Sequence, residues 1–123
     1  MKYTIRLANE NDLAALCNVR NNKDLFKYYL ERSERKEVYL VIAEQEAHII
    51  GFAILKVNGN LLPKLSDLYV KDSYRGNGIG SALIKYRENI AKTLGYSEIF
   101  VSVDPIENPK MIKLIKRQGY EAI

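Results

Sequence analysis

The chain has 123 residues and a mass of 14.1 kDa, enough for one domain with a hydrophobic core and too little for two. Its 47% hydrophobic and 28% charged residues are typical of a soluble globular protein, and no apolar run approaches the ~20 residues of a membrane span. The start MKYTIRLANE does not read as a signal peptide, so we expect a cytoplasmic protein with no membrane partner.

Cysteine, histidine and charge narrow the function classes further. A single Cys17 excludes an internal disulfide, and with one histidine, His48, it cannot form a Cys/His metal cluster. The net charge of +4 would suit nucleic acid, but Lys and Arg are spread along the chain among acidic residues. A small polyanionic ligand explains the positive excess as well, so we expect neither a metal nor a nucleic-acid partner.

The first half of the chain predicts a strand, two helices and a hairpin. Residues 3–7 alternate like a strand, and Asn9 or Asn11 offers an N-cap to a first helix whose apolar face includes Cys17. Residues 21–33 form a second helical segment, in which Tyr28 and Tyr29 are an aromatic pair of core and rim. The runs 38–43 and 48–57, joined by residues 44–47, are β-branched strands of a hairpin with both faces buried.

The second half predicts a central strand, a long helix, a further strand and a last helix. The central strand covers residues 61–70, and Pro63 requires an edge or a bulge in its early part. A helix from near Gly78 to Gly95 follows, then a strand over residues 98–103 and a helix from Asn108 to a C-cap at Gly119. The apolar stripe of the long helix contains Ile79, Leu83, Tyr86, Ile90 and Leu94. This order predicts an α/β fold with a mixed sheet, as a single domain over residues 1–123.

The stretch DLYVKDSYRGNGIGSAL, residues 67–83, joins the central strand to the long helix. The first turn of a helix leaves backbone N–H groups without partners, and the helix dipole adds partial positive charge there, so the turn binds an anion. Gly76, Gly78 and Gly80 allow close approach of the backbone, and Arg75 adds a permanent charge. The pattern is typical of a pyrophosphate site. The alternative is an ordinary strand-to-helix turn.

The pattern Arg75-x-x-Gly78-x-Gly80 after an apolar strand resembles the acyl-CoA signature of the GNAT N-acetyltransferase superfamily, (Q/R)-x-x-G-x-(G/A). The longer piece SDLYVKDSYRGNGIGSALI is particularly similar to the diamine and ribosomal-protein acetyltransferases. The resemblance implies a GNAT-like sheet with helices on both faces, in which the central strand and the next one splay apart. It also implies acetyl-CoA as co-substrate and the transfer of its acetyl group to a primary amine by direct attack in a ternary complex.

The resemblance assigns roles to individual residues. The backbone of the central strand would pair with the pantetheine amides, the turn would hold the pyrophosphate, and an asparagine of the last helix would contact the cofactor from the other side. The pantetheine residues are Leu68, Tyr69 and Val70. The pyrophosphate residues are Arg75, Gly76, Asn77, Gly78, Ile79, Gly80 and Ser81, and the asparagine of the last helix is Asn108. The N–H of Val70 would also stabilise the oxyanion. The resemblance places the second helical segment beside the acceptor site, so an acceptor contact of Tyr28 or Tyr29 is the alternative to a pair of core and rim.

Three features depart from the family pattern. Diamine acetyltransferases carry Glu-Asp where this chain has Ser66 and Asp67, so Asp67 is the candidate base. This role requires a bulge that turns its side chain toward the acceptor. The alternative is a structural aspartate that pairs with a lysine or caps backbone N–H groups. Ile115 replaces the tyrosine that protonates the leaving thiolate. Family members continue past the position of Gly119-Tyr120 through two further strands, so we expect the C-terminal strands to be short or missing here. Either the sequence is a piece of a longer chain, or a partner chain covers the exposed edge of the sheet, and we therefore expect a homodimer.

Two other function classes stay open. A non-catalytic acyl-CoA sensor or regulatory module would also fit, given Ser66, Ile115 and the missing end. A dinucleotide-binding protein is less favoured, because residues 71–75 separate the strand from the first glycine and Ser81 stands in place of the third. The acceptor amine stays open in every case: a protein amino terminus, a lysine, a polyamine and an aminosugar all suit the pattern.

Overall fold

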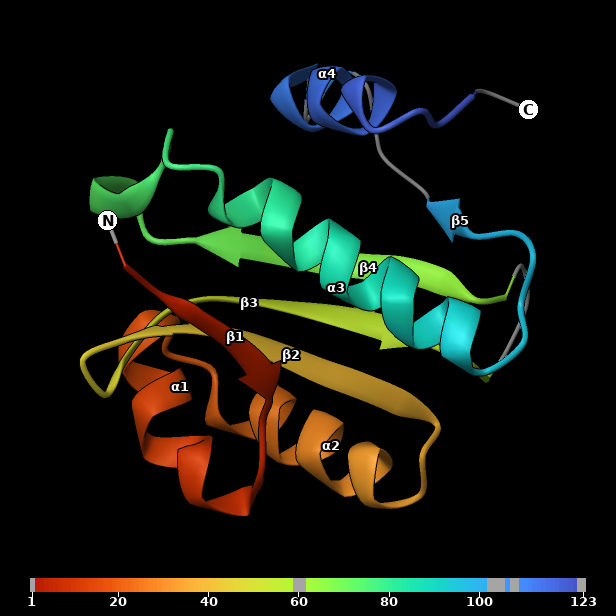
Figure 1. Ribbon diagram of the computed structural model, residues 1–123. Coiled ribbons are helices and arrows are strands. Elements are labelled where there is room, and N and C mark those ends of the chain that lie inside the picture. Colours follow the sequence, from red (N-terminus) through yellow and green to blue (C-terminus); the bar gives the residue numbers. More distant parts are fainter. Residues whose placement is uncertain (1, 59–61, 102–105, 107–108, 122–123) are drawn as a thin grey trace.

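The computed structural model describes residues 2–58, 62–101, 106 and 109–121. The elements follow the order β1 (Thr4–Leu7), η1 (Glu10–Asp12), α1 (Leu13–Val19), α2 (Lys23–Glu34), β2 (Val38–Gln45), β3 (His48–Lys56), β4 (Lys64–Val70), η2 (Asp72–Tyr74), α3 (Ile79–Thr93), β5 (Phe100–Val101) and α4 (Pro109–Arg117), where η marks a short 3-10 helix (Figure 1). The predicted α/β order is thus confirmed.

The sheet is mixed and opens at one side. Its five strands run in the order β1-β2-β3-β4-β5; the first four are antiparallel, and β5 lies parallel to β4. Among the described residues, β4 and β5 pair only at Lys64 with Phe100 and at Leu65 with Val101. Beyond Leu65, β4 has no parallel partner among the described residues, and the residues that follow Val101 lie outside them.

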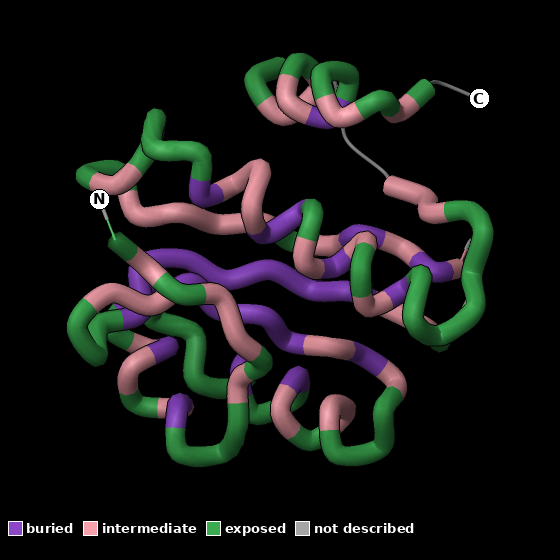
Figure 2. Tube along the Cα trace, in the orientation of Figure 1, coloured by how far each residue is buried: buried purple, intermediate pink, exposed green. Residues whose placement is uncertain are grey.

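Helices cover both faces of the sheet (Figure 1). The helices α1 and α2 pack on one face with residues such as Phe26 and Phe52, whose rings meet edge to face with centroids 5.0 Å apart. The helix α3 packs on the other face through Ile79 and Leu83, and α4 adds Ile115 beside it. Because β2 and β3 are covered on both sides, they are buried along most of their length (Figure 2).

Two strand boundaries differ from the prediction. The hairpin strands extend to Gln45 and from His48, so only Glu46 and Ala47 connect them, with φ angles of 49° and 66°. A two-residue turn with positive φ matches the twist of the strands, which is why the hairpin is tighter than predicted. The strand β4 begins at Lys64, after Pro63, whose missing N–H is therefore not needed in the ladder.

The buried stripe of α3 also differs from the predicted one. Ile79 and Leu83 are buried as expected, but Tyr86 and Ile90 are only half-buried, and Leu94 is 46% exposed. The buried stripe continues instead through three residues that the prediction did not include, namely Ile84, Arg87 and Ala91. The helix therefore turns a different face to the sheet, and one of its buried residues is charged.

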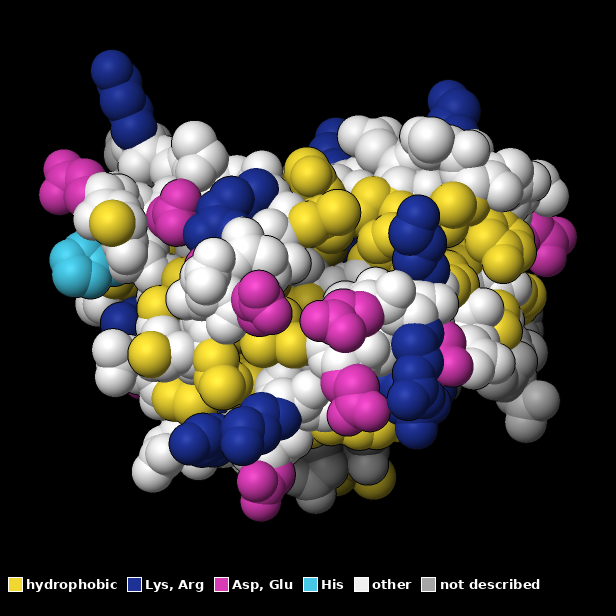
Figure 3. Space-filling view, turned by 90° about the horizontal axis from the view of Figure 1, so that it is seen from below, with side chains coloured by type: hydrophobic (Ala, Val, Ile, Leu, Met, Phe, Trp, Pro, Cys, Tyr) yellow, Lys and Arg dark blue, Asp and Glu magenta, His cyan; other side chains and the backbone are white. Residues whose placement is uncertain are grey.

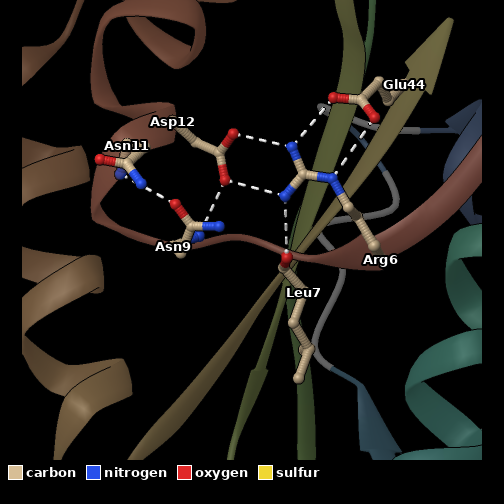
Figure 4. Close-up of polar contacts among 6 residues, drawn as sticks. All are labelled: Arg6, Leu7, Asn9, Asn11, Asp12 and Glu44. Atoms are coloured by element: carbon tan, nitrogen blue, oxygen red, sulfur yellow. Dashed lines mark hydrogen bonds and ion pairs between the residues drawn. The ribbon is translucent and has the colours of Figure 1, made fainter. Parts of the chain in front are cut away.

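The N-terminal segment is fixed by a polar network (Figure 4). The Arg6 guanidinium donates to Asp12 at 2.8 and 3.0 Å and to Glu44 on β2 at 2.9 Å. Asp12 also accepts from the backbone N–H of Asn9 at 2.8 Å, while the Asn9 side chain caps η1, as predicted for Asn9. The network joins β1, η1 and β2, so the first helix starts at a defined place.

No helix among the described residues is both long and apolar enough to cross a bilayer. On the face formed by α1 and α2, Lys and Arg side chains alternate with Asp and Glu, and the histidine, His48, lies at the rim (Figure 3). That face therefore offers no extended patch of one charge, as expected from the mixed order of charges in the sequence.

Candidate active site

The glycine-rich turn between β4 and α3 has the backbone conformation that the sequence predicts. Gly76 and Gly78 have φ angles of 82° and 78°, in the left-handed region that residues with a Cβ rarely adopt. The short helix η2 brings the chain from the end of β4 to this turn, and α3 starts at Ile79 with Gly78 as its N-cap. The turn thus directs the first backbone N–H groups of a 15-residue helix outward.

The first N–H groups of α3 are available to a ligand. The first amide that bonds back into the helix is that of Ala82, which donates to the Gly78 carbonyl at 3.0 Å. Within the described part of the chain, the amides of Ile79, Gly80 and Ser81 donate to no protein acceptor. They lie at the positive end of the helix dipole, so the turn can bind an anion.

Arg75 and Asn77 brace the turn. The Arg75 Nε donates to the Val70 carbonyl at 3.0 Å, its Nη1 lies 2.7 Å from the Asp72 carboxylate, and its guanidinium lies 5.9 Å from the Tyr69 ring centroid. The Asn77 amide donates to the Tyr74 carbonyl at 3.0 Å. Arg75 stays 57% exposed, so it has donors left for a ligand beyond those that hold the turn.

The open edge of β4 leads away from this turn. The amide of Lys71 donates to the Ile50 carbonyl at 2.9 Å, so Lys71 belongs to a hydrogen-bonded pair of the ladder with β3. Because such pairs alternate along an antiparallel ladder, Tyr69 bonds to β3, and the backbone groups of Val70 and Leu68 point the other way. That side has no β5 partner among the described residues. The Val70 carbonyl there accepts from Arg75, but the Val70 N–H and the backbone groups of Leu68 can pair with an extended ligand.

A bulge displaces Asp67 from the ladder. Ala53 pairs with Leu68 and Ile54 pairs with Ser66, which leaves Asp67 as an extra residue with a φ of 31°. The bulge turns the Asp67 side chain to the face covered by α2, as the hypothesis of a base required. There the Tyr29 hydroxyl donates to Asp67 Oδ2 at 2.5 Å, and Asp67 itself is exposed.

Tyr29 is buried, while its partner reaches solvent. Burial, and then the hydrogen bond to Asp67, raise the pKa of Tyr29 well above its usual range, so the hydroxyl stays protonated and donates. Among the described residues, Asp67 bonds neither to a lysine nor to a backbone N–H, and its partner is the Tyr29 hydroxyl. Its second carboxylate oxygen, Oδ1, has no donor among these residues and can take a proton.

The remaining candidate residues have structural positions. Cys17 packs partly buried against the core beneath the sheet, His48 is exposed, and Ile115 is 8% exposed in the cluster between α3 and α4. Tyr28 is 47% exposed with the Arg32 guanidinium 4.9 Å above its ring, at the rim of the Asp67 side. Asn108 lies outside the described residues.

Two residues, Tyr29 and Arg87, contact the bulge without a sequence pattern that predicts the contact. Tyr29 and Asp67 lie 38 positions apart, so no local pattern connects them. Arg87 lies beneath the bulge, where its Nη1 donates to the carbonyls of Ile54 and Ser66 at 2.8 and 3.0 Å. The sequence offers one indication that Arg87 is buried: its position on the helix is one at which the spacing of the apolar residues also allows burial.

An open groove of about 650 Å³ lies elsewhere, between the end of α3, β5 and the end of α4. Its walls include Tyr96, Phe100 and Tyr120, whose hydroxyl donates to Glu88 at 2.7 Å. It contains no residue of the glycine-rich turn and does not contain Asp67, so it is a separate surface feature.

Comparisons with known proteins agree with this geometry. Residues 6–120 match the model of a family described as the acetyltransferase (GNAT) family. No curated protein matches the sequence. Many solved structures match, among them the PaiA N-acetyltransferase of Thermoplasma acidophilum in complex with coenzyme A, with a TM-score of 0.87, 22% identity, and coverage of 100% of this chain and 92% of that one.

Two further structures share the fold. AAC(6')-Iy, in complex with the bisubstrate analogue CoA-S-monomethyl-acetylneamine, has a TM-score of 0.86 and 22% identity over 99% of this chain and 92% of its own. The ribosomal-protein-alanine N-acetyltransferase of Brucella melitensis has a TM-score of 0.80 and 25% identity over 96% of this chain and 84% of its own. The fold is therefore shared over nearly the whole length of this chain.

Proposed function

Since this chain belongs to the GNAT acetyltransferase family, we propose that it is an enzyme that transfers an acetyl group from acetyl-CoA to a primary amine. The observation that carries the proposal is the set of amides at Ile79, Gly80 and Ser81, which have no acceptor among the described residues, next to an edge of β4 that has no strand partner among them and leads to Asp67. The free amides would hold the pyrophosphate, and the Arg75 guanidinium would add charge beside them. The related structures solved with coenzyme A or with an analogue of it support the same assignment.

The edge of β4 fits an extended thioester arm. Four residue steps lead from Asp67 to Lys71, a span of about 13 Å at ~3.3 Å per residue. The backbone groups of Leu68 and Val70 would pair with the amides of the arm, in the manner of an added strand. The acetyl group would then lie near the bulge, where the N–H of Leu68, which is nearer to it than the N–H of Val70, would stabilise the oxyanion that forms.

The reaction we propose has one chemical step of addition and one of elimination. The amine lone pair attacks the thioester carbonyl, the C–N bond forms, and the carbonyl electrons move to the oxygen. The C–S bond then breaks as the carbonyl reforms, and coenzyme A leaves as a thiolate. An alkyl ammonium has a pKa near ~10.4, so the amine must lose a proton, which Asp67 Oδ1 would accept directly or through water.

The leaving group needs no acid at the position of Ile115. A free thiol has a pKa near ~8.5, so a thiolate is a fair leaving group near neutral pH and can take its proton from water. The described residues offer no activated nucleophile beside the open edge, because Cys17 packs against the core on α1. We therefore propose direct attack rather than a covalent acetyl-enzyme.

The test is thiol release from acetyl-CoA with a panel of amines: a polyamine, a lysine peptide, a peptide with a free amino terminus and an aminosugar. We expect turnover on at least one amine and its loss in Asp67→Asn, while Asp24→Asn, an exposed carboxylate on α2, keeps wild-type turnover. Equal activity of the two variants would refute the role of Asp67.

A second candidate is a non-catalytic acyl-CoA-binding module, which the buried Ile115 favours because the usual acid is absent. Tight binding of CoA without turnover on any amine would select it. A dinucleotide site gains no support, because β1 to β4 are antiparallel and a dinucleotide fold requires parallel strands. The predicted homodimer and the cytoplasmic location stay predictions; mass measurement at micromolar concentration tests the first.

A further inference from the structure

Arg87 is the most deeply buried charged residue among those that the structure describes. It lies on α3 and is 2% exposed, whereas most arginines keep their guanidinium in water. Burial lowers the pKa of Arg87 to about 10, so the guanidinium still carries its charge at neutral pH. Within the described part of the chain, no carboxylate lies close enough to form an ion pair with it. A buried charge of this kind is costly unless its donors are fully used.

The Nε and Nη1 atoms of Arg87 donate to backbone carbonyls. The Nε donates to Leu83 in the preceding turn of α3 at 3.1 Å, which fixes the direction of the side chain. The Nη1 then donates to Ile54 on β3 at 2.8 Å and to Ser66 on β4 at 3.0 Å. One nitrogen therefore joins two neighbouring strands.

The two strand carbonyls flank the place where the ladder is interrupted. Ile54 and Ser66 are partners in the register, and the next pair is Ala53 with Leu68, so Asp67 is the residue left over. A bulge removes cross-strand donors from the backbone around it, and a buried carbonyl without a donor costs free energy. Arg87 supplies the donors that the interrupted ladder lacks.

We propose that Arg87 is a positioning residue for the amine acetyltransferase reaction: it holds the β4 bulge open so that Asp67 faces Tyr29 and the acceptor side. Counted from Leu65, strand alternation would place residue 67 toward α3 and away from Tyr29; the bulge brings it instead into phase with Tyr69, on the face covered by α2. Arg87 touches no substrate and acts only through the backbone of Ser66. The inference rests on the proposed function, because it concerns the candidate base of that reaction.

The test compares three variants on α3. Arg87→Met removes the charge and all donors but keeps an unbranched side chain, and Arg87→Lys keeps the charge with one nitrogen in place of three. Lys85→Met is the matched control, because Lys85 is exposed on the same helix and loses the same charge. The first readout is the NMR contact between the Tyr29 ring and the Asp67 side chain, which needs no activity. The second is the split between kcat and the KM for acetyl-CoA.

We expect the Tyr29–Asp67 contact in the wild type and in Lys85→Met, and its loss in Arg87→Met. Because misplacing a reacting group by about 1 Å costs on the order of 100-fold in rate, kcat should fall about 10- to 100-fold, with the KM for acetyl-CoA changed less than about twofold. The kcat of Arg87→Lys should lie between those of the wild type and Arg87→Met. This variant keeps the charge and provides the comparison if Arg87→Met does not fold. A retained contact or a wild-type kcat in Arg87→Met overturns the proposal. If Arg87→Met loses the contact but the wild type acetylates no amine, the proposed function is wrong. The role of Arg87 in the bulge then still holds.

Discussion

Replacing Gly78 with alanine should weaken the binding of coenzyme A with little steric effect. Gly78 has a φ of 78°, and a Cβ built there has no heavy atom within 4 Å, so backbone strain is the only cost. A non-glycine residue in the left-handed region costs about 1–2 kcal/mol. The turn is exposed, so in the free protein the new alanine can relax to a negative φ, but the bound state needs the original conformation to direct the amides of α3. The strain then appears in binding, as an increase in Kd of about 5- to 30-fold.

Gly95 provides the matched control. It has a φ of 95° and equally open surroundings, but it lies after α3, at the end remote from the turn. In Gly95→Ala, the same strain should lower the free energy of unfolding by about 1–2 kcal/mol and leave the Kd for coenzyme A unchanged. Titration calorimetry gives the Kd, and urea unfolding gives the stability. A wild-type Kd in Gly78→Ala, or equal weakening in the two variants, would refute the assignment of the turn.

Three further predictions concern the base, the core and the acid stability. Asp67→Asn should lower kcat by about 10²- to 10⁴-fold at saturating substrates in the thiol-release assay, and a wild-type rate contradicts a general base at this position. Phe26→Ala, at a side chain with 0% exposure, should cost about 3–5 kcal/mol in urea unfolding; a loss below about 1 kcal/mol would mean that its contact with Phe52 is not part of the core. The hydrogen bond from Arg6 lowers the pKa of Asp12 below its ordinary 3.8, so its stabilisation is complete above that pH and is lost as the pH falls through the lower folded-state value. The stability of Asp12→Asn should therefore depend less on pH in this acid range than that of the wild type, and identical acid profiles would show that Asp12 contributes nothing.

The parts of the fold that the sequence predicts are those with local causes. The glycine-rich turn needs only its own residues to reach positive φ at Gly76 and Gly78, and α3 ends at Gly95 for the same reason. The hairpin and the two-sided burial of β3 follow from a continuous apolar run, which only a covered strand can accommodate. The predicted bounds of these elements therefore agree with the structure to within a few residues.

The environment of Asp67 has causes that lie far along the chain. The bulge carries no glycine and depends on Arg87, 20 residues later, while the partner of the carboxylate is Tyr29, 38 residues earlier. Reasoning from periodicity assigns a charged residue of an amphipathic helix to solvent, so it placed Tyr86 in the stripe in place of Arg87. From the sequence, Asp67 could serve as the base only if a bulge forms beside it. No pattern in the sequence indicates whether that bulge forms.

Among the described residues, the edge of β4 beyond Leu65 has main-chain donors and acceptors that no other strand uses. Such a surface attracts any extended peptide, including a neighbouring molecule of the same kind. A bound co-substrate would shield it, so saturation with coenzyme A should both raise the melting temperature and suppress aggregation during purification or heating.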